Sequence, residues 1–280
     1  MPAKIGNETG KRIVISLMVL GLAGAGAVLM GRNSSTGLKA MYLRAEHLNL
    51  VYECAEPKKL DEHRTLSRRE MGELKLPSGR IMACDPIAFQ PFPPFTVTVK
   101  PGSYPGTAYI INYAENNDNR VALAAVFFND EKAVRWEMAL ISKKQRLADL
   151  EEGSFFGYPV DAGAGGFMSA EAADFYEAKM REDYEQNRDK YEMDIGGASV
   201  FIGGLFDDMP WDKLIEKFQA DYVPTYSVLN EELEGSGGLN MLMFSSGLGD
   251  GHYPSYFGYD QNGQVSCLVT DFLIIDEDVY

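Results

Sequence analysis

The sequence predicts an α+β protein, mainly antiparallel β-sheet with two or three packed helices, preceded by one N-terminal transmembrane helix. Three patterns support this. Alternating apolar and polar residues, separated by turn residues, indicate antiparallel strands. Two stretches with apolar residues three and four apart indicate amphipathic helices. An uncharged apolar run at 13–30 is long enough to cross a bilayer, since a helix of that length reaches roughly 27 Å.

The apolar run also fits a second interpretation. Lys11 and Arg12 precede it, and the small residues at 23–27 offer two sites at which a signal peptidase cuts. We favour a retained anchor, because the run continues through Met30 beyond those sites. Flanking basic residues weakly favour a cytoplasmic N-terminus. An anchor places the globular domain outside the cytoplasm at the cytoplasmic membrane, and cleavage makes it periplasmic or secreted.

Four regions are expected along the chain. They are a basic tail at 1–12, the transmembrane helix or signal sequence at 13–31, a linker and charged surface segment at 32–75, and a single globular domain at 76–280. Within the third region, residues 58–73 are highly charged with few apolar residues, which indicates a solvated loop or surface helix.

Charge and cysteine content narrow the class of protein. The net charge of −15 disfavours binding to nucleic acid or to an anionic membrane surface, because phosphates would be repelled. A cationic protein partner or plain solubility fits this charge. The three cysteines, Cys54, Cys84 and Cys267, sit among apolar residues and are expected to be buried free thiols, with one disulfide as the alternative.

Strands dominate the first half of the domain. The prolines of 89–95 forbid a helix there, and residues 95–100 alternate as a half-buried strand does. Turn residues at 116–119 and 129–130 are expected to join later strands as meander hairpins. The strands predicted in this half are 81–84, 95–100, 107–113, 121–128 and 133–141.

Two helices follow. Ser169 is a suitable N-cap for a helix through Tyr191. A second helix is expected from Asp208 until Pro224 ends it, with Trp211, Leu214, Ile215, Phe218 and Tyr222 on its buried side. The apolar, glycine-rich residues 195–206 between them are expected to cross the interior, and an exposed contact loop is the alternative.

The chain is expected to end in antiparallel strands. These are residues 239–244, 255–259 and 265–273. Asn262-Gly263 between the last two is a strong signal for a type I′ hairpin turn.

Several segments resemble a known family. They are LPSGRIMACDP (76–86), PFTVTVKPGSYP (94–105), VRWEMAL (134–140), GYPVDAGAGGFMS (157–169), SSGLGDGHYPSYFGYD (245–260) and CLVTDF (267–272). In this order they resemble the bacterial domain-of-unknown-function family 4241. The resemblance implies a shared fold over about 76–273 and no mechanism. Leu248 stands where a tryptophan is usual, Ser169 stands where an acidic residue is usual, and the insert at 195–206 is unfamiliar.

Two glycine-rich turns within these segments are the candidate binding site. Their glycines permit positive φ angles, and their aspartates are common turn formers. The glycines precede a strand rather than a helix, which argues against a nucleotide site. Ser246 and His252 lack the surroundings of an activated nucleophile. The predicted binding residues are Asp161, Gly163, Gly249, Asp250, Gly251, His252, Tyr253 and Asp271, and no catalytic, metal or cofactor residue is predicted.

Five acids would converge if the strand ends meet. They are Asp85, Glu137, Asp161, Asp250 and Asp271. Oxygen-rich clusters suit calcium or magnesium. For Glu137, an ion pair with Arg135 on the same strand face is the expected role.

Two functions from different classes remain. The first is an exported, membrane-anchored module that binds a protein partner, with an immunity-type protein binding a toxin or envelope partner as one form. Export, acidity and the lack of a catalytic constellation favour it. The alternative is a metal-dependent enzyme built on the carboxylates of Asp161 and Asp250, acting outside the cytoplasm.

Overall fold

Two antiparallel sheets pack face to face in the computed structural model, which describes residues 30–32, 45–151, 154–195, 198–201, 212–220, 222–223 and 225–275. The first sheet has seven strands. Their order is β2 (Lys58–Lys59), β3 (Arg64–Leu76), β5 (Gly102–Tyr113), β6 (Asp118–Phe127), β17 (Val265–Asp271), β16 (Ser255–Tyr259) and β7 (Arg135–Met138). The second sheet has the order β13 (Val228–Glu232), β14 (Asn240–Ser245), β10 (Ala164–Ser169) and β4 (Ile81–Cys84).

The main core lies between these sheets. Phe167 of β10 and Phe244 of β14 pack against each other with ring centroids 5.0 Å apart, and Phe244 also meets Phe272. The seven-stranded sheet contributes buried residues from β3, β5, β6, β16 and β17 to the same cluster. Burial of this apolar surface is the main contribution to stability of the two-sheet arrangement.

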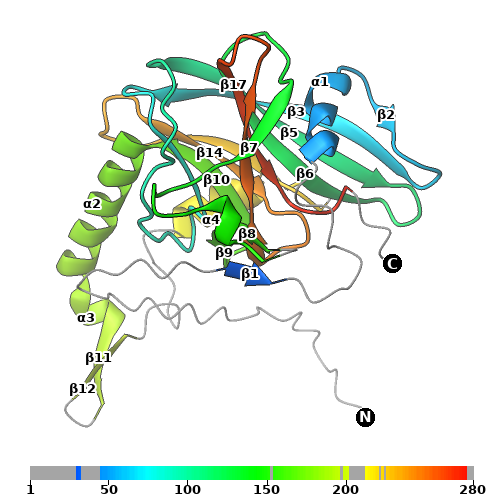
Figure 1. The fold of residues 1–280 in the computed structure, drawn as a ribbon. Helices are drawn as coiled ribbons and strands as arrows, with labels where there is room; N and C mark the ends of the chain where they lie inside the picture. The colour runs from blue at the N-terminus through cyan, green and yellow to red at the C-terminus, as the bar shows by residue number, and fades with distance from the viewer. Residues whose placement is uncertain are drawn as a thin grey trace, which may run out of the picture.

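The outer face of the seven-stranded sheet is also covered. The helical turns η2 (Ala45–Asn49) and α1 (Leu50–Glu53) lie across it, and Leu48 and Val51 are buried against β3, β5 and β6 (Figure 1). Strand β6 is therefore buried on both faces, which explains why residues 121–126 are apolar without alternation.

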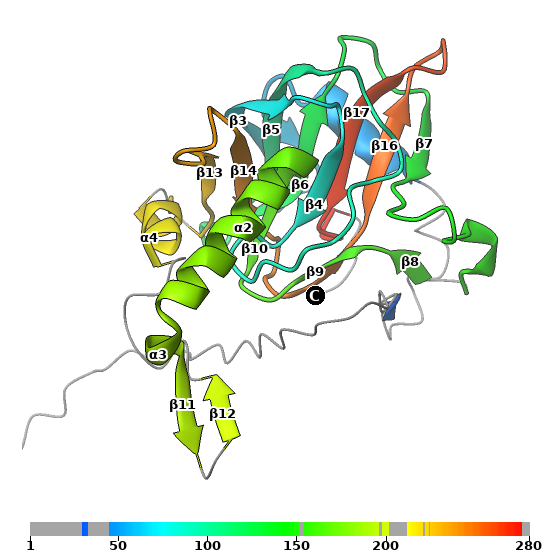
Figure 2. The same cartoon turned by 90° about the vertical axis from the view of Figure 1, so that its left-hand side faces the viewer.

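Helices cover the outer face of the four-stranded sheet. Figure 2 shows α2 (Ala170–Gln186) crossing it, with α4 (Asp212–Ala220) beside β13. Ser169 caps α2 as predicted, because its hydroxyl accepts a hydrogen bond from the Ala172 amide at 2.9 Å. The short helix α3 (Arg188–Tyr191) follows. The α+β class with mainly antiparallel sheet is thus confirmed.

Residues 58–73 differ from the prediction. They form β2 and most of β3, in the seven-stranded sheet, instead of a loop or surface helix. Four apolar side chains of β3 are buried, namely Leu66, Met71, Leu74 and Leu76. Leu48, Leu66, Met71 and Leu74 extend the core into residues expected to be linker and surface segment.

The strand connections also differ in two places. Strands β5 and β6 form a hairpin, but β16 and β17 lie between β6 and β7, so residues 129–130 do not close a meander. Residues 95–100 alternate in burial as predicted, yet form only one isolated bridge, Arg80 with Thr98.

The predicted hairpin between β16 and β17 is confirmed, but the predicted type I′ turn is wrong. The Gly263 amide donates to the Asp260 carbonyl at 3.0 Å, and Gly263 alone in the loop has a positive φ, +74°. A type I′ turn needs two successive positive φ angles, so this loop is a type I turn followed by a bulge glycine.

The remaining predicted helix residues divide into two groups. In α4, Leu214 and Phe218 are buried as expected, whereas Tyr222 is 57% exposed, which corrects its predicted burial. Asp208, Trp211 and Pro224 lie outside the described residues. Within 195–206, strand β12 (Ala198–Phe201) pairs with β11 (Glu192–Ile195) as a hairpin beyond the end of α2, not between the main sheets (Figure 2).

Two further strand pairs flank the main sheets. Strand β9 (Tyr158–Val160) pairs with β15 (Gly251–Tyr253), and β1 (Met30–Arg32) pairs with β8 (Ser154–Phe156). The turn η3 (Leu147–Asp149) precedes β8. The predicted transmembrane segment up to residue 29 lies outside the described residues. No helix in the part of the chain that the structure describes is long and apolar enough to span a bilayer.

Candidate functional site

The two glycine-rich turns lie against each other. Strands β9 and β15 pair antiparallel, with His252 opposite Pro159. The Ser246 amide donates to the Gly163 carbonyl at 3.1 Å, and the Gly163 amide donates to Asp250 Oδ1 at 3.0 Å. Both the amide and the carbonyl group of Gly163 therefore bond to a segment more than 80 residues away in the sequence.

The buried Asp85 side chain holds this junction together through hydrogen bonds to backbone amides. It follows β4 directly and is only 3% exposed. Its Oδ1 accepts hydrogen bonds from the amides of Ile87 and Ala88, and its Oδ2 accepts from those of Asp161 and Ala162, all at 2.7–2.9 Å. Burial raises the pKa of the Asp85 carboxyl group, and these four hydrogen bonds act in the opposite direction. Both oxygens are thus occupied by backbone donors.

The other two acids of the junction are on its surface. Asp161 and Asp250 are both exposed. Partial burial raises the pKa of Asp250, the hydrogen bond from Gly163 lowers it, and repulsion from the nearby Asp161 carboxylate raises it. The two carboxylates therefore form a small negative surface beside Gly163.

The interior of the second turn is closed by its own hydrogen bonds. The buried Ser246 hydroxyl donates to the Gly249 carbonyl at 2.8 Å, and the Tyr253 hydroxyl donates to the same carbonyl at 2.8 Å. Ser246 is thus held by the backbone rather than by a base. Desolvation lowers the pKa of the half-buried His252, so its neutral form is favoured.

The glycines serve different purposes. Gly163 and Gly249 have φ angles of +66° and +117°, and an added Cβ at either would face open space. Gly247 also has a positive φ, +55°, but a Cβ there would lie 2.8 Å from the Cβ of Phe272. Backbone conformation alone selects glycine at the first two positions, and close packing adds to it at Gly247.

One large apolar side chain stands at the tip of the turn. Leu248 is 49% exposed and lies between Gly247 and Gly249. Asp250, two residues later, is also exposed, and it accepts a hydrogen bond from Gly163 near the Asp161 carboxylate. The outer surface of the junction therefore combines one leucine with two carboxylates.

Comparison with known protein families decides the classification. Residues 74–270 match DUF4241, described as a protein of unknown function. The chain belongs to the DUF4241 family. No curated protein and no solved structure matches the chain.

The DUF4241 match confirms the resemblance seen in the sequence, and the structure shows where its segments meet. Seven of the eight predicted binding residues lie at the junction of the two turns, namely Asp161, Gly163, Gly249, Asp250, Gly251, His252 and Tyr253. Asp271 does not. It is 2% exposed, and its Oδ2 lies 2.7 Å from Nε2 of His47, on the helical turns that cover the outer face of the sheet.

The five acids expected to converge do so only in part. Asp85, Asp161 and Asp250 come together, whereas Asp271 pairs with His47, and Glu137 pairs with Arg135 as predicted. Among the described residues, no three His, Cys, Asp or Glu side chains are arranged to hold a metal ion. The three cysteines are buried free thiols, as expected.

Several features of the DUF4241 domain were not predicted, among them the role of Asp85 and the strands β9, β10, β13 and β15. Asp85 was considered only as an acid, although Asp85-Pro86 directly after a strand is a turn signal. Strand β13 was missed altogether, and its short VLNEE segment alternates only weakly.

Proposed function

We propose that the chain is an exported, membrane-anchored module that binds a protein partner through the junction of its two glycine-rich turns. The observation that carries this proposal is the division of polar groups at the junction. Asp85, Ser246 and Tyr253 are engaged by the backbone inside it, while Leu248, Asp161 and Asp250 face outward. An exposed apolar side chain beside two carboxylates suits a partner surface that offers an apolar pocket with lysine or arginine at its rim.

Charge and location support the same function. The net charge of −15 favours encounter with a cationic partner, and the apolar run at 13–30 gives the sequence-based reason to place the domain outside the cytoplasm. An immunity-type protein that binds a toxin is one form of such a module. A toxin gene adjacent to the coding sequence would support that form.

Site-specific photo-crosslinking in cells tests the contact face. A photoreactive amino acid replaces Leu248 in the full chain, and the matched control replaces Leu147, which is similarly exposed at 46%. We expect a crosslinked protein from position 248 and none from position 147. The double variant Asp161→Asn, Asp250→Asn should reduce the yield about tenfold, because it removes two charges from the contact.

Two results would count against the proposal. Equal crosslinking from positions 147 and 248 would show that the junction is not a specific contact. Turnover of a substrate by the purified full chain that is lost with Asp161→Asn would favour an enzyme instead. N-terminal sequencing of the chain isolated from cells separates a retained anchor from a cleaved signal sequence, since cleavage at 23–27 removes the start of the chain.

A further inference from the structure

One edge of β13 carries backbone groups that have no partner among the described residues. In the described part of the chain β13 pairs only with β14. The Ser245 amide donates to the Ser227 carbonyl, and the Leu233 amide donates to the Leu239 carbonyl. Hydrogen-bonded pairs alternate along an antiparallel ladder, so residues 229 and 231 bond to β14, while Val228 and Asn230 direct their N–H and C=O groups to the free edge.

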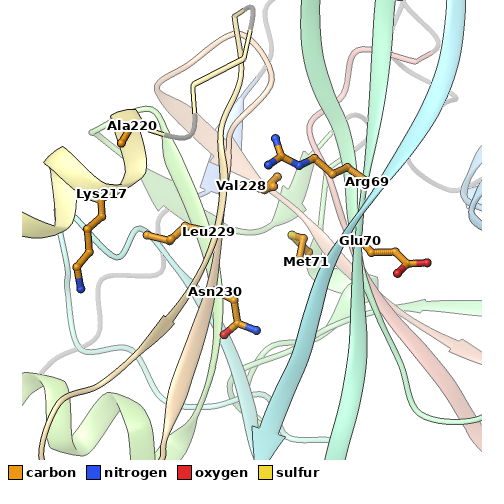
Figure 3. A pocket seen from close by; sticks show the side chains of 8 residues that line it. All are labelled: Arg69, Glu70, Met71, Lys217, Ala220, Val228, Leu229 and Asn230. Atoms are coloured by element: carbon orange, nitrogen blue, oxygen red, sulfur yellow. The ribbon is translucent and has the colours of Figure 1, made fainter.

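A groove of about 480 Å³ follows this edge (Figure 3). Helix α4 contributes Lys217 and Ala220 on one side of β13, and strand β3 contributes Arg69 and Met71 on the other. Met71 lies on the same side of β3 as Arg69, two residues earlier, and it is the extra residue of a β-bulge, between Glu70 paired with Thr107 and Gly72 paired with Gly106.

The opposite edge of the same sheet is protected. Along β4, the Phe95 amide donates to the Ile81 carbonyl and the Val99 amide donates to the Gly79 carbonyl, so the segment 95–99 covers that edge. Natural sheets cover or charge their edges in this way to prevent unwanted pairing. In the part of the chain that the structure describes, the middle of β13 is lined by a groove and no segment covers its edge.

The side chains that line the groove also indicate which side chains a bound strand would carry. Each side of β13 has one apolar contact and one cation, Met71 with Arg69 toward β3 and Ala220 with Lys217 toward α4. The lining carboxylate, Glu70, points away from β13 (Figure 3). Lys217 contacts Glu231 at 2.5 Å, and Arg69 lies over the ring of Tyr226. The groove therefore carries one cation on each wall, and the cation on the α4 side is paired with Glu231.

We propose that this groove binds an extended segment of a partner protein, with alternating aliphatic and acidic residues, as a fifth strand beside β13. Main-chain hydrogen bonds to Val228 and Asn230 supply affinity, and alternate side chains meet the two walls. In either register the acidic residues face one of the two cations while the aliphatic residues face the other wall. This surface shares no residue with the junction of the glycine-rich turns, and the inference does not depend on a partner there.

Amide hydrogen exchange of the full chain tests the proposal. The probe is an acetylated and amidated hexapeptide of alternating valine and glutamate. With the peptide in excess, exchange at Val228 and Asn230 should slow about tenfold or more, while the Leu229 and Glu231 amides, already bonded to β14, change little. A peptide alternating valine and lysine, and the valine–glutamate peptide with N-methylated amides, should produce no protection, because they lack the charge or the donors.

Protein variants distinguish peptide binding in the groove from unspecific binding elsewhere on the protein. The double variant Arg69→Gln, Lys217→Gln should weaken peptide binding about tenfold, since it removes one charge from each wall. Lys213→Gln is the matched control, because Lys213 is exposed on the same helix and does not line the groove. Circular dichroism and urea unfolding establish that each variant is folded.

The opposite results would overturn the inference. These are protection elsewhere without protection at Val228 and Asn230, equal binding of the N-methylated peptide, or equal loss with Lys213→Gln. Concentration-dependent protection of the same amides without any peptide would assign the edge to a second copy of the chain instead.

Discussion

The junction of the glycine-rich turns and the edge of β13 use backbone hydrogen bonds in opposite ways. At the junction, Asp85, Asp250 and the Gly163 carbonyl accept hydrogen bonds from backbone amides of segments distant in sequence. At the β13 edge, the amides of Val228 and Asn230 face a groove. The family motifs therefore surround the more closed of the two regions. In this domain, the most recognisable residues build the structure, and the contact surfaces lie around and beside them.

Of the substitutions at the junction, replacement of Asp85 should lower the free energy of unfolding most. In Asp85→Asn, an amide group would face one of the two pairs of backbone donors, leaving buried N–H groups unpaired. We expect the free energy of unfolding to fall by about 3 kcal/mol, because a buried carboxylate with several hydrogen bonds is lost. Urea unfolding of the full chain, followed by circular dichroism, measures this change.

Asp161→Asn is the matched control for Asp85. Its side chain is exposed, and Asp85 binds only its backbone amide, which the substitution keeps. Its unfolding free energy should stay within about 0.5 kcal/mol of the original. Equal stability of the two variants would mean that the Asp85 hydrogen bonds do not hold the junction together.

A glycine pair should give the next largest effect. Gly247→Ala and Gly163→Ala both force alanine into a positive φ, which costs about 1 kcal/mol or more in each. Only the alanine at 247 also meets Phe272, at 2.8 Å. We expect Gly247→Ala to lose about 2–3 kcal/mol in total, because overpacking adds to the strain. Thermal unfolding of both variants compares them directly.

Equal effects of the two glycine substitutions would contradict this prediction. If Gly163→Ala were as destabilising as Gly247→Ala, the space around Gly163 would be filled, and the junction would be packed from outside. That result would also argue against an accessible contact face at Asp161 and Asp250.

Local patterns in the sequence predicted much of the fold. The Ser169 cap, the apolar side of α2 and seven of the eleven strands in the two main sheets were found because they depend on residues close in sequence. Strand β3 was missed for a physical reason. Leu66 packs on the outer face of the seven-stranded sheet, whereas Met71 and Leu74 pack between the sheets, and the bulge at Met71 shifts the alternation once, so the buried positions show no period of two. The insertion of β16 and β17 between β6 and β7 depends on long-range pairing, which has no local signal.

The site was predictable in position but not in its internal chemistry. The turns that carry Gly163 and Gly249 were identified from their glycines and aspartates. The role of Asp85 was not, because its partners are backbone amides, including those of residues 161 and 162, and any sequence supplies backbone amides. Asp271 was assigned to the turns because a carboxylate at a strand end has no visible direction in sequence, and the fold turns it toward His47.

The smallest expected effect concerns His252, at the boundary between the closed interior and the open surface of the junction. Its folded pKa lies below the usual histidine value of 6.5, so the unfolded chain takes up a proton first as the pH falls. The His252 contribution should therefore destabilise the fold as the pH falls below 6.5, until the folded form also becomes protonated. In His252→Gln this part of the pH dependence should disappear, while stability at pH 8 changes little. Urea unfolding between pH 8 and pH 5 measures it, with exposed His63→Gln as the control. An unchanged pH profile in His252→Gln would mean that His252 is as well hydrated in the folded chain as in the unfolded one, and the junction would then be open to water beneath its surface.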